Sequence, residues 1–536
     1  MTVLERTSPR QEGRPMRVID YFDKGAQHNG DRFFIVSDEG NVTYAEAARH
    51  SRRLAAGLYA RGFSPGDGVG VLAPNVSEGL LGMLGLWRAG GVWAPLNHLN
   101  ALSATLDFMN EVKVRWLLLH SRFADQVDEI LAHVPTLKHV ICLDKPFAGA
   151  ESMADVLAAG DGVDIPDWSD PFGAPTAVCA TWPTGGTTGR SKAVIWTNDV
   201  FANLIDLSTR HWPASEHPVN LMVAPITHAA GVMAVILAAQ GATVVIRPGF
   251  DAEDALGRIE RDGVTHVFLP PTAYYRMLEG QKARPRDCSS LKMLLIAAAP
   301  VSPDKFSEGV TAFGPCIAQC WGQAEAPMLL TYLSPQQVAA AVAGDHPERL
   351  ASCGHPTLSC QVEAMDDQGN LLAPGERGEL VVRGRLVTSG YHNRPEDTAA
   401  IRTFGWHHTG DVGYLDENGF VYIVDRKKEM VVTGGFNVYP AEVESAILAL
   451  PEVRDCAVIG IPDDEWGEAV CALVIPAEPG WADAGHIIST SKATLGSVKA
   501  PKVVHFVDSL PSTPVGKVDK KAIRARYWKG RTRSVN

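Results

Sequence analysis

The fold of the N-terminal half is predicted from a pair of segments, residues 43–62 (TYAEAARHSRRLAAGLYARG) and 68–74 (GVGVLAP). The first segment has apolar residues at helical spacing, and the second is a short apolar run bounded by glycine and proline. The same pairing returns at 78–90 followed by 91–96, and at 251–263 followed by 265–270. Helices that alternate with short apolar strands are typical of βαβ units, so the sequence predicts an α/β fold with parallel strands.

The pattern changes toward the C-terminus. Closely spaced turns around residues 378–391 (GELVVRGRLVTSGY) predict β-rich structure. Beyond them, a helix at 440–451 (PAEVESAILALP) and strands at 455–462 and 469–476 indicate a compact α+β domain. The charged run at 425–429 is the predicted boundary, which divides the chain into an N-terminal domain, 1–427, and a C-terminal domain, 428–536.

Composition indicates a globular protein and excludes several classes. The 536 residues are 46% hydrophobic and 21% charged, with a net charge of −12 and basic residues clustered only beyond residue 516, which argues against a nucleic-acid binder. Nine cysteines lack metal-ligand spacing and indicate reduced thiols. No run has the length expected of a signal peptide core or a membrane span, so we expect a cytoplasmic protein.

A loop of small and hydroxyl residues carries the clearest chemical signal. In residues 180–194 (ATWPTGGTTGRSKAV), glycines let backbone N–H groups approach phosphate oxygens, hydroxyls add donors and a lysine neutralises charge. Taken alone, such a segment is also compatible with a flexible surface loop. It is not a P-loop, because GxxxxGK[ST] is not matched. The candidate phosphate-binding residues are Thr184, Gly185, Gly186, Thr187, Thr188, Gly189 and Lys192.

This loop resembles the signature [ST]SG[ST]TGxPKG of the adenylate-forming superfamily, which contains acyl-CoA synthetases, nonribosomal adenylation domains and firefly luciferase. Three positions differ: Gly185 stands where the family has serine, Ser191 where it has proline and Ala193 where it has glycine. The missing serine hydroxyl is expected to weaken one phosphate contact by about 0.5–1.5 kcal/mol. Further motifs follow in the family's order along nearly the whole chain, which makes the resemblance specific.

Two of these motifs imply an acyl pocket. Residues 224–231 (APITHAAG) resemble the segment that carries the family's gate to the acyl group, here His228 followed by Ala229. Residues 294–303 (LLIAAAPVSP) place Ala297, Ala298 and Ala299 at a GGAP-like turn against the acyl group and the adenine. A packed histidine and an ordinary turn after a buried strand are the alternatives.

Residues 321–327 (WGQAEAP) resemble YGxTE. The resemblance implies that Trp321 stacks on adenine, that Gly322 lies beside the nucleotide and that Glu325 binds Mg²⁺. Ala324 replaces the family's threonine, which removes a second hydroxyl near the phosphates.

Residues 408–428 (HTGDVGYLDENGFVYIVDRKK) are the strongest match, resembling TGD followed by DRxKD. They imply that Asp411 accepts hydrogen bonds from both ribose hydroxyls and that Arg426 contacts the ribose or a phosphate. A surface aspartate in a β-turn is the alternative for TGD alone.

The last motifs imply that the enzyme alternates between an adenylation state and a thiol-transfer state. Lys428 matches the hinge about which the C-terminal domain rotates. Gly434 and Gly435 belong to a segment resembling GGENIYPxEVE, which in the family lines the tunnel for the pantetheine arm of coenzyme A. Trp466 lies in a segment that resembles family sequence near the same thiol-binding side of the enzyme. Residues 511–524 (PSTPVGKVDKKAIR) resemble the family's C-terminal PxxxxGK motif, which implies that Lys517 bridges the substrate carboxylate and the α-phosphate.

Together the motifs imply a large N-terminal domain, with two α/β subdomains and a small β-barrel, and a mobile α+β C-terminal domain. They imply an ATP- and Mg²⁺-dependent acid–thiol ligase that forms an acyl-AMP, releases pyrophosphate and transfers the acyl group to coenzyme A. One alternative is an enzyme that hands its acyl-AMP to a carrier protein or a separate partner. Another is a non-catalytic nucleotide-binding protein, suggested by Gly185 and Ala324.

The sequence leaves the carboxylic acid open. Small residues near the implied gate, at 229–230 and 297–299, suggest room for an aryl, medium-chain or polycyclic acid. Whether the chain forms a homodimer is also open.

Overall fold

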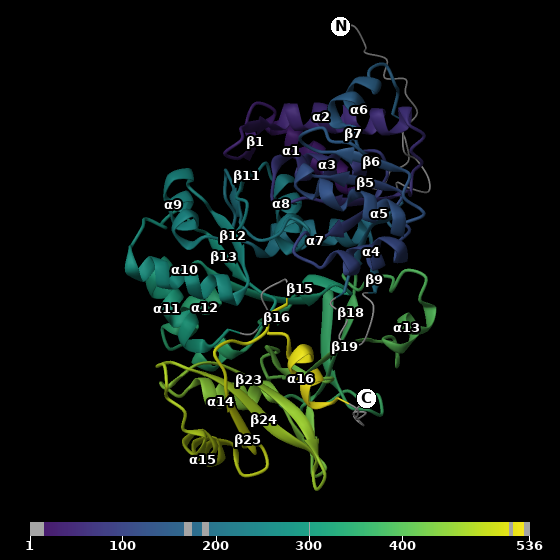
Figure 1. Cartoon of the computed structure of the whole chain (residues 1–536). Coiled ribbons are helices and arrows are strands. Elements are labelled where there is room, and N and C mark those ends of the chain that lie inside the picture. The colour runs from purple at the N-terminus through teal and green to yellow at the C-terminus, as the bar shows by residue number, and fades with distance from the viewer. Residues whose placement is uncertain (1–15, 166–173, 185–191, 300, 514–517, 530–536) are drawn as a thin grey trace. The chain divides into compact units, whose positions relative to one another are not determined.

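Helices and strands alternate along most of the chain in the computed structural model, which describes residues 16–165, 174–184, 192–299, 301–513 and 518–529 (Figure 1). This alternation confirms the predicted α/β class. The chain divides into two units. Unit 1 consists of residues 1–186, 190–268 and 388–394, and unit 2 of residues 187–189, 269–387 and 395–536.

Unit 1 contains a seven-stranded sheet in the order β7-β6-β5-β3-β4-β8-β9. All its neighbouring strands are parallel except the antiparallel pair β8–β9. The strands are β3 (Gly68–Leu72), β4 (Val92–Leu96), β5 (Trp116–Leu119), β6 (His139–Cys142), β7 (Glu151–Ser152), β8 (Val178–Pro183) and β9 (Ala193–Thr197). The connecting helices are α2 (Tyr44–Ala60), α3 (Ser77–Arg88), α4 (Leu102–Glu111), η1 (Ser121–Gln126), α5 (Val127–His133) and α6 (Met153–Ala159).

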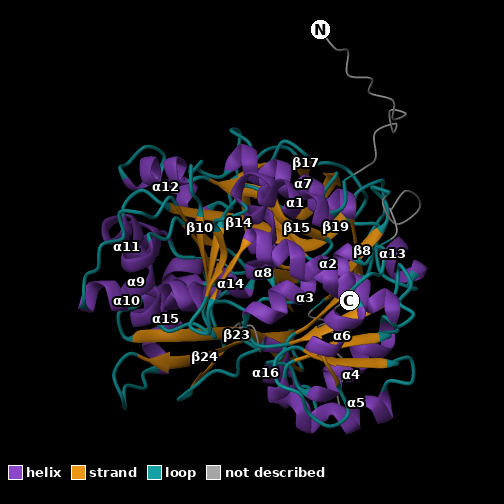
Figure 2. Cartoon of the chain, turned by 90° about the horizontal axis from the view of Figure 1, so that it is seen from above, coloured by secondary structure: helices purple, strands orange, loops and turns teal. Residues whose placement is uncertain are grey.

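The predicted segments at 43–62 and 68–74 lie in this part of unit 1. The predicted helix at 43–62 is α2, whose N-terminus is capped by Thr43 through a hydrogen bond from the backbone N–H of Glu46. The apolar run that follows is β3, at the centre of the sheet, and its side chains from Val69 to Leu72 are buried. Helix α3 packs on β3 and β4. Helices α2 and α3 also lie side by side (Figure 2).

Unit 1 also contains strands in the order β12-β10-β11-β1-β2. Strands β12, β10, β11 and β1 run parallel, whereas β2 is antiparallel to β1. The strands are β1 (Phe33–Val36), β2 (Asn41–Thr43), β10 (Val219–Met222), β11 (Thr243–Ile246) and β12 (His266–Leu269). The helices beside them are α1 (Val18–Asn29), α7 (Asn198–His211), α8 (Ala229–Ala238) and α9 (Ala252–Asp262).

Unit 2 begins with the strand order β16-β15-β14-β13. These strands are β13 (Met293–Ile296), β14 (Ile317–Gln323), β15 (Ala326–Leu333) and β16 (His355–Pro356). The accompanying helices are α10 (Pro271–Ala283), α11 (Pro303–Phe313), α12 (Pro335–Val342) and η2 (Pro347–Ala351).

The β-rich segment of unit 2 forms a four-stranded antiparallel sheet where the family resemblance implies a small barrel. Its order is β17-β18-β19-β20, and its strands are β17 (Cys360–Met365), β18 (Gly378–Gly384), β19 (His407–Leu415) and β20 (Val421–Arg426). Helix α13 (Pro395–Ala400) precedes β19.

The remainder of unit 2 has the helix and two strands predicted from the sequence. They are α14 (Pro440–Leu448), β23 (Val453–Asp463) and β24 (Gly467–Pro476). The other elements are β21 (Val431–Thr433), β22 (Phe436–Val438), α15 (Ala484–Leu495), β25 (Val503–Phe506) and α16 (Lys520–Tyr527). The boundary between the two units does not lie at residue 427. The boundary between an N-terminal domain, 1–427, and a C-terminal domain, 428–536, therefore stays a prediction.

Among the described residues, none of the helices is both long and apolar enough to cross a membrane.

Candidate active site

The base of the predicted phosphate-binding loop is closed by two hydrogen bonds at the end of the β8–β9 pair. The backbone N–H of Thr184 donates to the carbonyl oxygen of Lys192 at 2.9 Å, and the backbone N–H of Lys192 donates to Oγ1 of Thr184 at 3.3 Å. Residues 185–191, which include Gly185, Gly186, Thr187, Thr188 and Gly189, lie outside the described residues. The structure therefore places the two ends of the loop in direct contact.

Tyr391 lies beside this base, although no sequence pattern singled it out. The Nζ atom of Lys192 is 5.0 Å from the centre of the Tyr391 ring, within the range of a cation–π interaction. Two backbone hydrogen bonds hold the segment 390–392 against β9: Ile195 donates to Gly390 at 2.9 Å, and His392 donates to Ala193 at 2.7 Å. Tyr391 therefore restricts where the Lys192 ammonium can lie.

Replacement of Tyr391 by leucine is expected to raise the KM for ATP about threefold, because a cation–π contact at a partly exposed site contributes about 0.5–1 kcal/mol. Tyr391→Phe keeps the aromatic face and should retain the original KM. Steady-state kinetics with varied ATP checks this prediction. Equal KM values for the leucine and phenylalanine variants would show that the ring face does not position Lys192.

The candidate gate residue His228 stands immediately before α8, as its N-cap residue. Its ring centre is 6.5 Å from that of Trp182, with the two planes at 75°, and its Nδ1 lies 3.3 Å from Oγ1 of Thr227. Trp182 in turn stacks on Trp196, with 4.4 Å between ring centres. The half-buried His228 and Ala229 therefore lie beside an aromatic cluster. No sequence pattern indicated that Trp182 lies next to His228.

Three of the predicted nucleotide-binding residues meet in unit 2. The buried carboxylate of Asp411, only 3% exposed, accepts a hydrogen bond at Oδ2 from Nε1 of Trp321 at 3.0 Å. Its Oδ1 lies 2.6 Å from Nε of Arg426, which is its register partner across β19 and β20. Because a carboxylate has about four acceptor sites, ribose hydroxyls can still donate to Asp411.

Gly322 follows Trp321 in a position that excludes any side chain. A Cβ atom there would lie 2.4 Å from the backbone nitrogen of Met328. This close approach of β14 and β15 explains why glycine follows the tryptophan.

The predicted turn at Ala297, Ala298 and Ala299 follows the buried strand β13. Ala298 has φ of +81°, in the left-handed region that residues with a Cβ rarely occupy. Strained backbone of this kind is concentrated at functional sites. The geometry supports a specialised turn at this place, where the family signature has glycine.

Glu325 lies in the tight turn between β14 and β15, next to Ala324. Mg²⁺ in nucleotide sites is usually held by one or two carboxylates together with substrate phosphates and water. In the described part of the chain, no three His, Cys, Asp or Glu side chains form a metal-binding group. The carboxylate chemistry of Glu325 fits Mg²⁺ that is held together with substrate phosphates.

Some of the residues predicted to lie where coenzyme A binds contact one another in the structure. Gly434 and Gly435 have φ of +57° and +80° and form the turn between β21 and β22. The backbone N–H of Gly434 donates to the carbonyl oxygen of Trp466 at 2.9 Å, and a Cβ at Gly434 would lie 2.5 Å from the indole. Trp466 is 47% exposed, which leaves much of the ring surface accessible. Lys428, the predicted hinge, is exposed just after β20.

Lys517 lies outside the described residues, but the helix that follows it is firmly anchored. Lys520 begins α16, and its Nζ lies 2.8 Å from Glu444 and 3.5 Å from Glu429. Burial lowers the pKa of Lys520, but these carboxylates outweigh burial and raise it overall. Burial also raises the pKa of Glu444. The lysine–carboxylate cluster therefore holds the start of α16 near the residues that follow the hinge.

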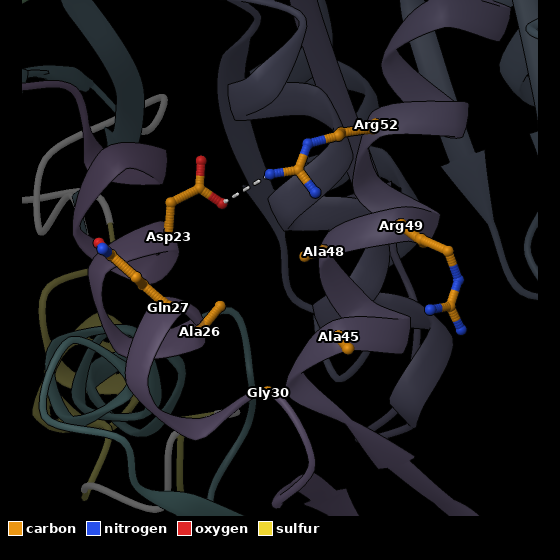
Figure 3. A pocket seen from close by; sticks show the side chains of 8 residues that line it. All are labelled: Asp23, Ala26, Gln27, Gly30, Ala45, Ala48, Arg49 and Arg52. Atoms are coloured by element: carbon orange, nitrogen blue, oxygen red, sulfur yellow. Dashed lines mark ion pairs between the residues drawn. The ribbon is translucent and has the colours of Figure 1, made fainter. Parts of the chain in front are cut away.

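One cavity of unit 1 takes no part in this site. It has a volume of about 550 Å³ and lies between α1 and α2, with Arg52 directed toward Asp23 (Figure 3). It contains none of the residues predicted to bind substrate.

Comparison with known proteins agrees with the motifs. The family model described as AMP-binding enzyme matches residues 22–392, and the model described as AMP-binding enzyme C-terminal domain matches residues 442–517. The medium/long-chain-fatty-acid–CoA ligase FadD8 of Mycobacterium tuberculosis is 36% identical, over 89% of this chain and 84% of that protein. Feruloyl-CoA synthase of Amycolatopsis sp is 35% identical, over 91% of this chain and 94% of that protein.

A solved structure shows the same relationship in three dimensions. The crystal structure of ATP-bound MatB from Rhodopseudomonas palustris matches with a TM-score of 0.84 and 29% identity, covering 96% of this chain and 99% of that chain. The family matches extend over most of the sequence, and the named relatives align over nearly their whole lengths. This chain therefore belongs to the AMP-binding enzyme family, in the acyl-CoA synthetase branch of the adenylate-forming superfamily.

Proposed function

We propose that this enzyme is an acyl-CoA ligase that activates an aryl, medium-chain or polycyclic carboxylic acid with ATP. It forms an acyl-AMP with release of pyrophosphate and then transfers the acyl group to coenzyme A. The observation that carries the proposal is the convergence of Trp321 and Arg426 on the buried carboxylate of Asp411 in a chain of this family. The relatives described above are named as CoA ligases, which supports acid–thiol ligation.

In the first half-reaction, the protein acts mainly by positioning and by stabilising charge. Asp411 accepts hydrogen bonds from the ribose, while Arg426 lies beside it toward the ribose or a phosphate. Lys192 and the loop of residues 184–189 contact the phosphates, and Lys517 approaches the substrate carboxylate and the α-phosphate. Mg²⁺ held by Glu325 neutralises charge on the phosphates when it is bound.

In the second half-reaction, the C-terminal domain, residues 428–536, rotates about Lys428 and withdraws Lys517. The thiol of coenzyme A then attacks the acyl carbon, the bond to AMP breaks and AMP leaves. Gly434, Gly435 and the exposed ring of Trp466 lie on the side from which the thiol enters. The contact between Gly434 and Trp466 supports a common role for these residues.

The acid class follows from the surroundings of the candidate gate. His228 lies beside Trp182, and Ala229 next to it has a small side chain. An aromatic wall beside small residues suits an apolar acyl group larger than acetyl. The named relatives act on medium- and long-chain fatty acids and on a feruloyl group, which supports the same range.

Neither alternative function is favoured. Delivery of the acyl-AMP to a carrier protein or a separate partner is less supported, since the relatives described above are CoA ligases. A protein without catalysis is not expected to retain the contacts of Asp411 with Trp321 and Arg426 together with Glu325 and Lys517.

Acid-dependent exchange of radiolabelled pyrophosphate into ATP tests the adenylation step across a panel of carboxylic acids. We expect exchange with at least one aryl, medium-chain or polycyclic acid and none without acid. Exchange only with acetate would refute the assigned acid class. Absence of exchange with every acid, in a protein that still binds ATP, would refute the adenylation activity.

A further inference from the structure

Glu379 lies on β18 and has a carboxylate that no assigned function uses. The side chain is only 12% exposed and stands where the register between β18 and β19 shifts. Its Oε1 accepts a hydrogen bond from the backbone N–H of Gly410 at 3.1 Å. Its Oε2 accepts one from Nζ of Lys427 at 3.1 Å and lies 3.1 Å from Nδ1 of His408. One largely covered carboxylate thus binds groups from both β19 and the residue that follows β20.

These contacts lie immediately beside the ribose-binding residues. Gly410 directly precedes Asp411, and Lys427 directly follows Arg426. The backbone N–H of Lys427 also donates to the carbonyl oxygen of Gly410 at 2.8 Å. The residue Gly410 is therefore held at its N–H by Glu379 and at its carbonyl by Lys427.

Gly410 lies inside β19, where the register with β18 shifts, and its φ of +71° sets the direction in which the strand enters Asp411. Burial opposes ionisation of Glu379, but His408 and Lys427 outweigh it and lower the pKa of the carboxyl group. The residue is thus an anion at neutral pH, and its hydrogen bonds to Gly410 and Lys427 are charge-assisted.

We propose that Glu379 is a positioning residue that orients the Asp411 carboxylate toward the ribose hydroxyls of the nucleotide. This inference rests on the proposed function, because it takes Asp411 as the ribose-binding residue. Glu379 acts through the irregular strand backbone at Gly410 and through Lys427. It contacts no substrate itself.

The experiment compares binding of ATP with binding of 2′,3′-dideoxy-ATP, which lacks both ribose hydroxyls, by calorimetry without any acid. The unsubstituted enzyme is expected to prefer ATP about 100-fold, since two hydrogen bonds to a charged group are lost with the dideoxy compound. Glu379→Gln should reduce this preference to about tenfold while binding of the dideoxy compound changes little. Asp367→Asn is the matched control, because Asp367 is the exposed second partner of Lys427 at 2.9 Å.

The outcomes separate the inference from the proposed function. If the unsubstituted enzyme binds both nucleotides equally, the ribose role of Asp411 fails. If the unsubstituted enzyme discriminates and Glu379→Gln discriminates equally well, or weakens both nucleotides by the same factor, only the inference fails. Should Glu379→Gln not fold, Glu379→Asp is judged by the same ratio, which does not depend on the folded fraction.

Discussion

Substitution of Lys517 by alanine is expected to slow acyl-AMP formation by about 1,000-fold, the upper range for loss of one group that stabilises charge in a transition state. Thiolysis of supplied acyl-AMP should stay within about threefold of the original rate, because the lysine has left the site when the thiol attacks. Single-turnover measurements of the two half-reactions check this prediction.

Lys521→Ala is the matched control for Lys517. It removes the same charge from an exposed position on α16 and should leave both half-reactions unchanged. An equal loss of both half-reactions in Lys517→Ala would assign the lysine to structure or to general binding rather than to adenylation.

Substitution of Asp411 by asparagine is expected to lower kcat/KM for ATP about 100-fold, because it weakens two charge-assisted hydrogen bonds from the ribose. It also leaves Arg426 without its ion-pair partner at 2.6 Å. Most of the loss should fall in KM, since the reacting carboxylate and α-phosphate do not contact Asp411. Steady-state kinetics of pyrophosphate exchange with varied ATP provides the measurement.

Glu417→Gln on the same hairpin serves as the control for Asp411, because it removes a carboxylate from an exposed turn. It should leave kcat/KM unchanged. An unchanged KM for ATP in Asp411→Asn would show that the buried carboxylate stabilises the sheet without binding the nucleotide.

Much of the fold was predictable because its signals are local. The amphipathic run at 43–62 became α2, and the apolar run after it became β3, since both patterns depend on residues a few positions apart. The helix at 440–451 and the two strands that follow were predicted for the same reason and are confirmed as α14, β23 and β24. The division into units was not predicted, because residues 388–394 join unit 1 through pairing with distant β9.

The residues of the candidate site that belong to a motif could be predicted from the sequence. The contacts between residues of distant segments could not. The motifs identified Trp321, Asp411 and Arg426, yet the hydrogen bond from the indole to the carboxylate depends on the approach of β14 to β19. Tyr391 beside Lys192 and Glu379 beside Gly410 arise in the same way. Local patterns carry no information about such pairs, because the pairing of distant strands and the packing of one sheet on another determine which residues meet.

In the proposed reaction, one chain performs both adenylation and transfer to coenzyme A. Thioester, AMP and pyrophosphate measured together after incubation with ATP, Mg²⁺, coenzyme A and each acid of the panel report on both steps. We expect equal amounts of acyl-CoA, AMP and pyrophosphate with at least one apolar acid. Formation of AMP and pyrophosphate without acyl-CoA, or of ADP in place of AMP, would contradict it.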